Sequence, residues 1–431
     1  MSWLHISAAE WQTDLAYLVD TLRRTHRNLF HTISPTAFYD AVRAFDTRIP
    51  SLASHEIVVG LARLLASVGD GHTYLSLDDV PAFRRYPLRL YQYSDGMHIQ
   101  AVAPSHADSA GARVVAIADS PIADAYAAMR AVVSHDNEMG VQSAAPVLLT
   151  IPEVLHACEI IATSEQATYM VQLTSGAYQT YAFQPIDVLP NDMVDARDHS
   201  VPAPLWLQQP ADRNWWTYLA DTQTLYAQYN RVQNLPDLPV TTFCDQLFQR
   251  IAQGQVQRLV LDIRRNSGGN MALNHALIHQ LIRCDTVNQW GKLFVIIGRG
   301  TFSAAMNLAV DLERHTRAVF VGEPTASRPN VYGENGIVVL PNCGLQCSIS
   351  FLWWQYSAPY DDRAWIKPEV SARLSAADYA ANRDPAIEAV LSYTLDPTHA
   401  IEYPDRLTKQ LHRHDLLLST SGVRTPRHQF G

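Results

Sequence analysis

The sequence predicts an α/β protein whose C-terminal half is built on a mostly parallel sheet, behind an N-terminal helical domain and a mixed α/β middle region. Apolar runs such as RLVLDIRRN and KLFVIIG alternate with helical segments in the C-terminal half, and each run is apolar on both faces. That pattern is typical of parallel strands covered by helices. The first 80 residues instead have helical periodicity, and short β-like runs separated by turn signals follow them.

Size and composition limit the classes of protein to consider. A chain of 431 residues exceeds one ordinary core, so two or three domains are expected. Hydrophobic residues make up 47% and charged residues only 17%, which argues against a disordered chain. The formal net charge of −9 argues against a nucleic-acid partner.

Signals for export, membranes and metals are weak or absent. No apolar run reaches the roughly 18 residues of a membrane span, and the first residues lack the pattern of a signal peptide, so a cytoplasmic location is expected. The five cysteines lie among apolar neighbours and are expected to be free thiols. Cys343 and Cys347 have no second pair of ligands at metal spacing, so no metal site is expected.

The N-terminal region predicts three helices. Leu15, Leu18 and Leu22 fall on one apolar stripe, and a second helix starts at Pro35 behind the cap Ser34. A third helix covers SHEIVVGLARLLASVG. We therefore place an N-terminal helical domain at 1–80.

The middle region predicts strands in LRLYQY, MHIQAVA, ARVVAIA and ATYMVQLT, with helices near 122–134 and 152–163. A segment rich in proline and aspartate follows as a linker, so a mixed middle domain with its linker is placed at 81–213. WWTYLADTQTLYAQYNRV predicts two strands, and alternating helices and strands continue to AVFVGE. An α/β core is placed at 214–395, and 396–431 is expected to be a polar, basic, solvated tail.

Two loops follow strands of the predicted parallel sheet, where sites of such sheets form. One contains Gly268 and Gly269, which either approach a ligand or simply turn into a helix. The other is GRGTFSAAM, in which Ser303 starts a helix. Ser303 is either a helix cap or a nucleophile at the positive end of the helix dipole. A serine nucleophile needs a base, and His72, in the turn DGHT, is one of 17 histidines.

Four segments in order resemble the tail-specific (C-terminal-processing) and tricorn-core serine peptidases, in the interphotoreceptor-retinoid-binding-protein-like branch. They are SVGDGHTYL, LVLDIRRNSGGN, GRGTFSAAMNLAVDLERHTRAVFVGEPTASRPNVYGE and WIKPEVSARLSAADYAANRDPAIEAVL. The resemblance runs from about residue 10 to 393. It implies a crotonase/ClpP-like core, a peptide or unfolded protein segment as substrate, and no cofactor.

The resemblance also implies roles for individual residues. Part of this family uses a lysine about 25 residues after the serine, but Arg328 stands there, and arginine is not a general base. Ser303 is therefore expected to be the nucleophile and His72 the base. The orienting acid maps to Asp362, with Asp361 as the adjacent alternative.

Further positions carry expectations with open alternatives. The oxyanion hole maps to the backbone N–H groups of Gly268 or Gly269 and of Ala304. Glu334 is either a substrate contact or a turn residue, and the pair formed by Asp262 and Arg264 is expected to fix its loop. The main functional alternative is a non-catalytic ligand- or peptide-binding protein on the same fold. The other is an esterase or amidase. The oligomeric state is left undefined.

Overall fold

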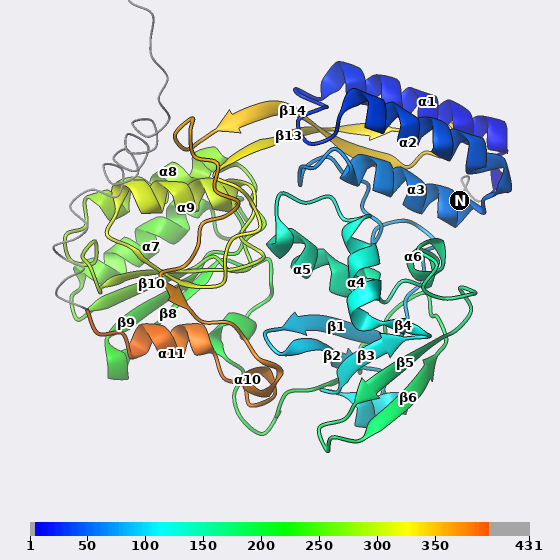
Figure 1. Ribbon diagram of the computed structural model, residues 1–431. Coiled ribbons are helices and arrows are strands. Elements are labelled where there is room, and N and C mark those ends of the chain that lie inside the picture. Colours follow the sequence, from blue (N-terminus) through cyan, green and yellow to red (C-terminus); the bar gives the residue numbers. More distant parts are fainter. Residues whose placement is uncertain (1–4, 396–431) are drawn as a thin grey trace, which may run out of the picture.

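The computed structural model describes residues 5–395, and the predicted basic tail at 396–431 lies outside the described residues. Three regions are visible: a group of N-terminal helices, a middle region with an antiparallel sheet, and an α/β core (Figure 1). A long two-stranded ribbon runs from the core to the N-terminal helices (Figure 1). The predicted fold class, a mixed α/β chain with a largely parallel core sheet, is confirmed.

The three predicted N-terminal helices are confirmed as α1 (Ala8–Thr25), α2 (Pro35–Arg48) and α3 (Ser54–Ala66). Ser7 and Ser34 cap the first two, each accepting a hydrogen bond from the backbone three residues on. The apolar stripe of α1 is buried in one hydrophobic cluster that also contains residues of α3 and of the middle region.

The middle region is an antiparallel sheet with helices on one side. Its strands pair in the order β1 (Leu88–Tyr93), β2 (Gly96–Val102), β3 (Arg113–Ile117), β5 (Ala167–Gln172) and β6 (Tyr178–Phe183), with short β4 (Ser120–Pro121) and β7 (Val194–Asp195) beside them. The helices are α4 (Ile122–Arg130), α5 (Glu138–Leu148) and α6 (Pro152–Ala157). Sequence analysis missed α5, because Gly140 and Pro146 interrupt its helical pattern. Asn137 nevertheless caps it.

The core is a six-stranded sheet in the order β15-β12-β11-β10-β9-β8, parallel except for β8. Its strands are β8 (Trp215–Leu219), β9 (Thr224–Gln228), β10 (Arg258–Asp262), β11 (Leu293–Ile297), β12 (Val319–Gly322) and β15 (Val370–Ser371). Its helices are α7 (Val240–Ala252), α8 (Asn274–Ile282), α9 (Ala304–His315), α10 (Ala376–Ala380) and α11 (Pro385–Leu391). Alternate side chains of β10 and β11 point to opposite faces, so α7, α8 and α9 cover one face and α11 covers the other.

The two-stranded ribbon consists of β13 (Asn330–Val339) and β14 (Gln346–Gln355), a hairpin that sequence analysis did not predict. Its far end joins the N-terminal hydrophobic cluster through Leu340, Cys343 and Leu345. The Asp14 carboxylate of α1 accepts hydrogen bonds from the backbone N–H groups of Asn342 and Cys343 at 2.9 and 2.8 Å. The hairpin therefore fastens the N-terminal helices to the core.

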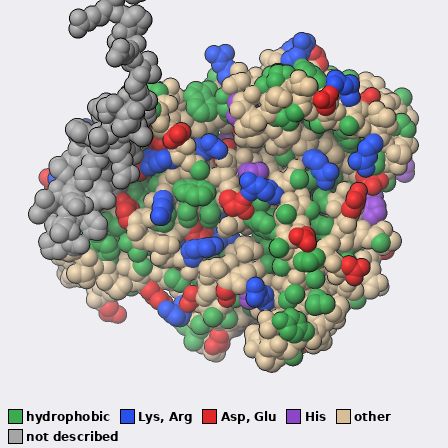
Figure 2. All heavy atoms as spheres, viewed as in Figure 1, with side chains coloured by type: hydrophobic (Ala, Val, Ile, Leu, Met, Phe, Trp, Pro, Cys, Tyr) green, Lys and Arg blue, Asp and Glu red, His purple; other side chains and the backbone are tan. Residues whose placement is uncertain are grey.

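The distribution of charged side chains and the state of the cysteines can also be compared with the sequence expectations. Basic and acidic side chains are interspersed on the face shown in Figure 2. All five cysteines are free, and three of them are buried. Within residues 5–395, no helix is long and apolar enough to cross a membrane.

Candidate active site

Ser303 stands at the start of α9 in an unusual backbone conformation. Its φ is +53° and its ψ −125°, a region that costs a residue with a side chain about 1–3 kcal/mol. Its side chain makes no capping hydrogen bond to the helix. Instead, its Oγ lies 3.1 Å from Nε2 of His72, 231 residues away in the chain. The helix-cap alternative is therefore not what the structure shows for this hydroxyl.

The loop before Ser303 is fixed to the end of β10. The Thr301 hydroxyl accepts a hydrogen bond from the N–H of Gly298 and donates one to the carbonyl oxygen of Ile263, at 3.1 and 2.9 Å. The N–H of Phe302 donates to the carbonyl oxygen of Asn266 at 3.1 Å. A rigid turn of this kind holds the strained Ser303 backbone in place.

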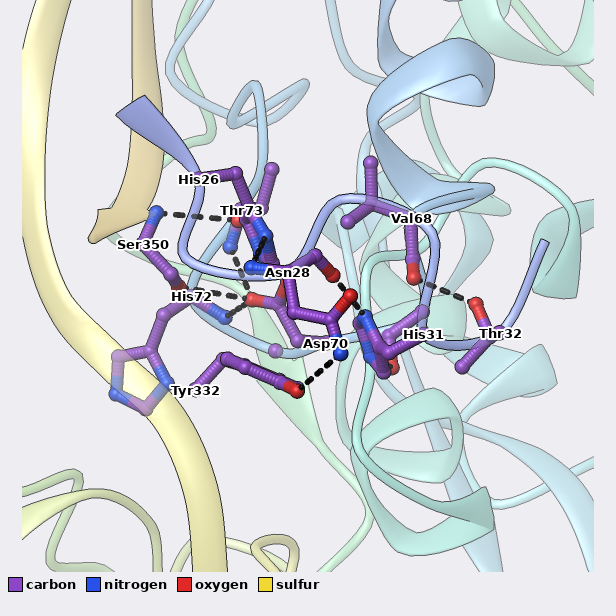
Figure 3. Close-up of polar contacts among 12 residues, drawn as sticks. His26, Asn28, His31, Thr32, Val68, Asp70, His72, Thr73, Tyr332 and Ser350 are labelled. Carbon is purple, nitrogen blue, oxygen red and sulfur yellow. Dashed lines mark hydrogen bonds and ion pairs between the residues drawn. The ribbon is translucent and has the colours of Figure 1, made fainter. Parts of the chain in front are cut away.

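His72 lies in the turn that follows α3 in the chain, and hydrogen bonds to Asp70 hold that turn in place. Oδ1 of Asp70 accepts the backbone N–H groups of His72 and Thr73, at 2.9 and 2.7 Å, and the hydroxyl of Ser350, at 3.0 Å. The His72 ring points away from this network toward β13 (Figure 3). It stacks on the Phe302 ring with centroids 4.5 Å apart and is only 6% exposed.

A second buried histidine completes the Asp70 network. Nε2 of His26 lies 2.9 Å from Oδ2 of Asp70, and Nδ1 of His26 accepts the N–H of Asn28 at 3.1 Å (Figure 3). The N–H of Asn28 assigns the proton of a neutral His26 to Nε2, facing Asp70. Burial alone would raise the pKa of the Asp70 carboxyl. The hydrogen bond from His26, with the donors above, outweighs burial and lowers that pKa.

Neither acid expected from sequence reaches the other side of the His72 ring. Nδ1 of His72 is buried and has no hydrogen-bond partner. Asp362 is exposed. Asp361 instead bonds to the hydroxyl of Ser357 at 2.6 Å and to the guanidinium of Arg363 at 2.8 Å. The structure thus departs from the expected contact between Asp362 and His72, because Arg363 and its partners anchor this segment away from the ring.

The backbone groups expected to form the oxyanion hole lie beside Ser303. A Cβ on Gly268 would stand 2.7 Å from Cβ of Ser303 and 2.8 Å from the nitrogen of Ala304, so glycine is required for this approach. The N–H of Ala304 is the first of α9, and such groups have no acceptor within a helix. The N–H of Gly268, however, donates to Oδ1 of Asn266 at 2.9 Å.

Gly269 and the pair of Asp262 and Arg264 lie at the end of β10 and in the loop that follows it. A Cβ on Gly269 would stand 2.3 Å from the carbonyl oxygen of Val232, so this glycine packs closely against the Val232 backbone, with which it forms an isolated parallel bridge. Arg264 bonds to Asp262 and holds Asp384 with two hydrogen bonds of 2.9 Å, an internal network that fixes its loop.

Glu334 is exposed in β13 with φ of +51°, one residue after Gly333. A Cβ on Gly333 would lie 3.8 Å from Cε1 of His72. Glu334 is therefore the next residue after Gly333, where the hairpin passes the His72 ring.

A cavity of about 650 Å³ is lined by residues of β1, of α5 and of the loop that precedes Ser303. Arg265, Gly300 and Glu323 are among its lining residues, whereas Ser303 and His72 are not. Within the described part of the chain, no group of three or more His, Cys, Asp or Glu is arranged to hold a metal ion.

Comparison with known proteins shows which solved structures share this fold. No family model matches this sequence, and no curated protein matches it. Among solved structures, mature CPAF complexed with lactacystin has a TM-score of 0.64 and 13% identity, over 89% of this chain and 97% of that one. Mature CPAF alone gives a TM-score of 0.63 and 14% identity, over 89% and 96%.

These similarities extend over almost the whole described chain and establish that it shares the fold of CPAF. The resemblance to interphotoreceptor-retinoid-binding proteins finds no support among them.

Proposed function

We propose that this protein is a serine peptidase in which Ser303 is the nucleophile and His72 its general base. The observation that carries the proposal is the 3.1 Å contact between Oγ of Ser303 and Nε2 of His72. Two residues so far apart in sequence meet there, one with a strained backbone and the other on a turn fixed by Asp70. A structural serine needs neither feature.

The chemistry is acyl transfer. His72 takes the hydroxyl proton as Oγ of Ser303 attacks a peptide carbonyl carbon, and the carbonyl oxygen becomes an oxyanion next to the N–H of Ala304 and the start of α9. One such donor contributes roughly 3–4 kcal/mol to transition-state stabilisation. His72 then gives the proton to the leaving amine, and water attacks the acyl-enzyme with His72 again as base.

A polypeptide substrate fits the surroundings of the pair. The β13–β14 hairpin passes next to the His72 ring at Gly333, and Leu352 and Trp353 on β14 are 39% and 45% exposed. A strand beside the site offers main-chain hydrogen bonds to an extended peptide, and exposed apolar side chains offer contacts to its side chains. We therefore favour a peptide or an unfolded protein segment over a small ester.

A fluorophosphonate probe tests the nucleophile. Wild-type protein is expected to be labelled at Ser303, as located by mass spectrometry of the labelled peptide. Labelling should be lost in Ser303→Ala and His72→Ala but retained in Ser392→Ala, which removes an exposed helix hydroxyl. Labelling that persists in Ser303→Ala contradicts the assignment, and an unlabelled, folded wild type favours a non-catalytic binding protein.

A second assay separates peptidase from esterase or amidase. Release of new amino termini from an unfolded protein, absent with Ser303→Ala, is expected of a peptidase. Turnover of small esters without any cleavage of unfolded protein would favour the esterase alternative.

A further inference from the structure

A carboxylate that sequence analysis did not consider lies against the base. Asp136, just before α5 in the middle region, is only 6% exposed. Its Oδ1 accepts the backbone N–H of Gly71, the residue before His72, at 2.8 Å. A Cβ on Gly71 would stand 3.4 Å from Cγ of Asp136, so the carboxylate abuts the backbone of the base directly.

The same carboxylate is connected to the nucleophile. Oδ2 of Asp136 accepts the hydroxyl of Ser327 at 3.0 Å, and the Ser327 oxygen in turn accepts the backbone N–H of Ser303 at 3.4 Å. Two hydrogen bonds therefore link Asp136 to Ser303, and one links it to the turn of His72. Three segments far apart in sequence meet at one carboxyl group.

The charges around Asp136 come from each segment packed against it. The 70–73 turn contributes His72 and Asp70, the segment after β12 contributes Arg328, and the neighbouring residue is His135. The Arg328 side chain donates to the backbone oxygen of Asp136 at 3.0 Å, not to its carboxylate.

Burial raises the pKa of the Asp136 carboxyl, and the charge of His72 is the largest influence that opposes this rise. Both carboxyl oxygens accept hydrogen bonds from donors, Gly71 and Ser327, as a carboxylate does. A buried carboxylate is stable only with a compensating positive charge nearby. His72 is the group that becomes positive there during the proposed reaction.

We infer that Asp136 is the positioning residue of this site, in place of Asp362. Its carboxylate balances the charge that His72 gains from the Ser303 proton, and it holds the base and the nucleophile in register through Gly71 and Ser327. This inference rests on the proposed function for its role in catalysis, but the electrostatic contact between Asp136 and His72 can be measured without any activity.

The test combines a titration and a rate. Histidine is labelled with ¹³C, and the ring signal of His72 is assigned by its absence in His72→Gln. In Asp136→Asn, the midpoint of the His72 titration should fall, because the negative charge that favours the protonated ring is removed. The acid limb of fluorophosphonate labelling should move in the same direction. Asp362→Asn is the matched control and should leave both unchanged.

Circular dichroism first confirms that each variant is folded. A His72 midpoint that is unchanged in folded Asp136→Asn overturns the inference, as does one that moves in Asp362→Asn instead. Absence of labelling in wild type contradicts the proposed function, while the titration still decides the contact between Asp136 and His72.

If Asp136→Asn does not fold, Ser327→Ala tests the connection to the nucleophile. Its His72 midpoint should stay within a few tenths of a pH unit of wild type, while labelling slows about 10- to 100-fold as Ser303 loses its alignment. Labelling at the wild-type rate in Ser327→Ala overturns the link.

Discussion

Two histidines flank the same aspartate and are equally buried, yet only one of them faces a serine hydroxyl. His26 and His72 are each 6% exposed, and Asp70 holds the ring of the first and the backbone of the second. Both ring nitrogens of His26 have protein partners. In His72, one nitrogen meets a serine hydroxyl and the other has no partner.

Burial therefore does not separate the two rings, whereas their hydrogen-bond partners do. The two Nε2 atoms face different groups: that of His26 faces a carboxylate, whereas that of His72 faces a hydroxyl whose proton it can accept. The buried Nδ1 of His72, which has no partner, costs about 1–3 kcal/mol. Such a cost persists only where the surroundings fix the group in place. The Asp70 turn and the stacked Phe302 ring supply that constraint for His72.

Replacing each histidine in turn should give the largest contrast. His72→Gln is expected to reduce fluorophosphonate labelling at least 10³-fold while the melting temperature changes little, since the base is lost but the Asp70 network is not. His26→Gln should retain labelling at temperatures where it is folded but melt earlier. If both folded variants lost labelling to the same extent, His72 would not differ from His26 in its effect on the nucleophile.

Removing the charge of Asp70 should mainly affect stability. Asp70→Asn removes a buried carboxylate that accepts hydrogen bonds from His26, from two backbone N–H groups and from Ser350, and the free energy of unfolding at pH 7 is expected to fall by about 1.5–3 kcal/mol. The pKa of Asp70 is lowered in the folded protein, so its contribution is present above the ordinary aspartate range near pH 4 and is lost as pH falls below it. Urea unfolding of wild type and variant between pH 3 and 7 measures this, and parallel pH curves would count against it.

Removing one donor to Asp70 should have the smallest effect. Ser350→Ala deletes a single hydroxyl of the Asp70 network and is expected to lower the free energy of unfolding by about 1 kcal/mol. Labelling should stay near the wild-type rate, because two backbone N–H groups still hold the turn. A labelling loss as large as that of His72→Gln would mean that the hydroxyl acts on the base directly.

The pattern of apolar and polar residues along the chain was enough to predict the strands and helices of the α/β core. The apolar runs of β10 and β11 and the start of α9 are set by neighbouring residues, so the strands, the helices and the loop of Ser303 were predicted from sequence. The helix α5 was missed because its glycine and proline hide a helix that its cap and packing stabilise.

The site itself depends on long-range contacts that no local pattern encodes. The β13–β14 hairpin was missed because one end of it packs on helices more than 300 residues earlier in the chain. Asp136 was missed for the same reason: its partners Gly71 and Ser327 are 65 and 191 residues away. Asp362 was mapped by counting from a motif, and counting does not detect that Arg363 ties this segment to Glu313.

The separation of Ser303 and His72 by 231 residues has a consequence for how the protein is made. A chain leaving the ribosome contains the histidine long before the serine exists, and the hairpin that fastens the N-terminal helices to the core is synthesised after both. The proposed catalytic pair is therefore assembled only after Ser303 and the hairpin have been synthesised and have folded onto the N-terminal helices. A partly made chain would then hold the proposed base without the proposed nucleophile.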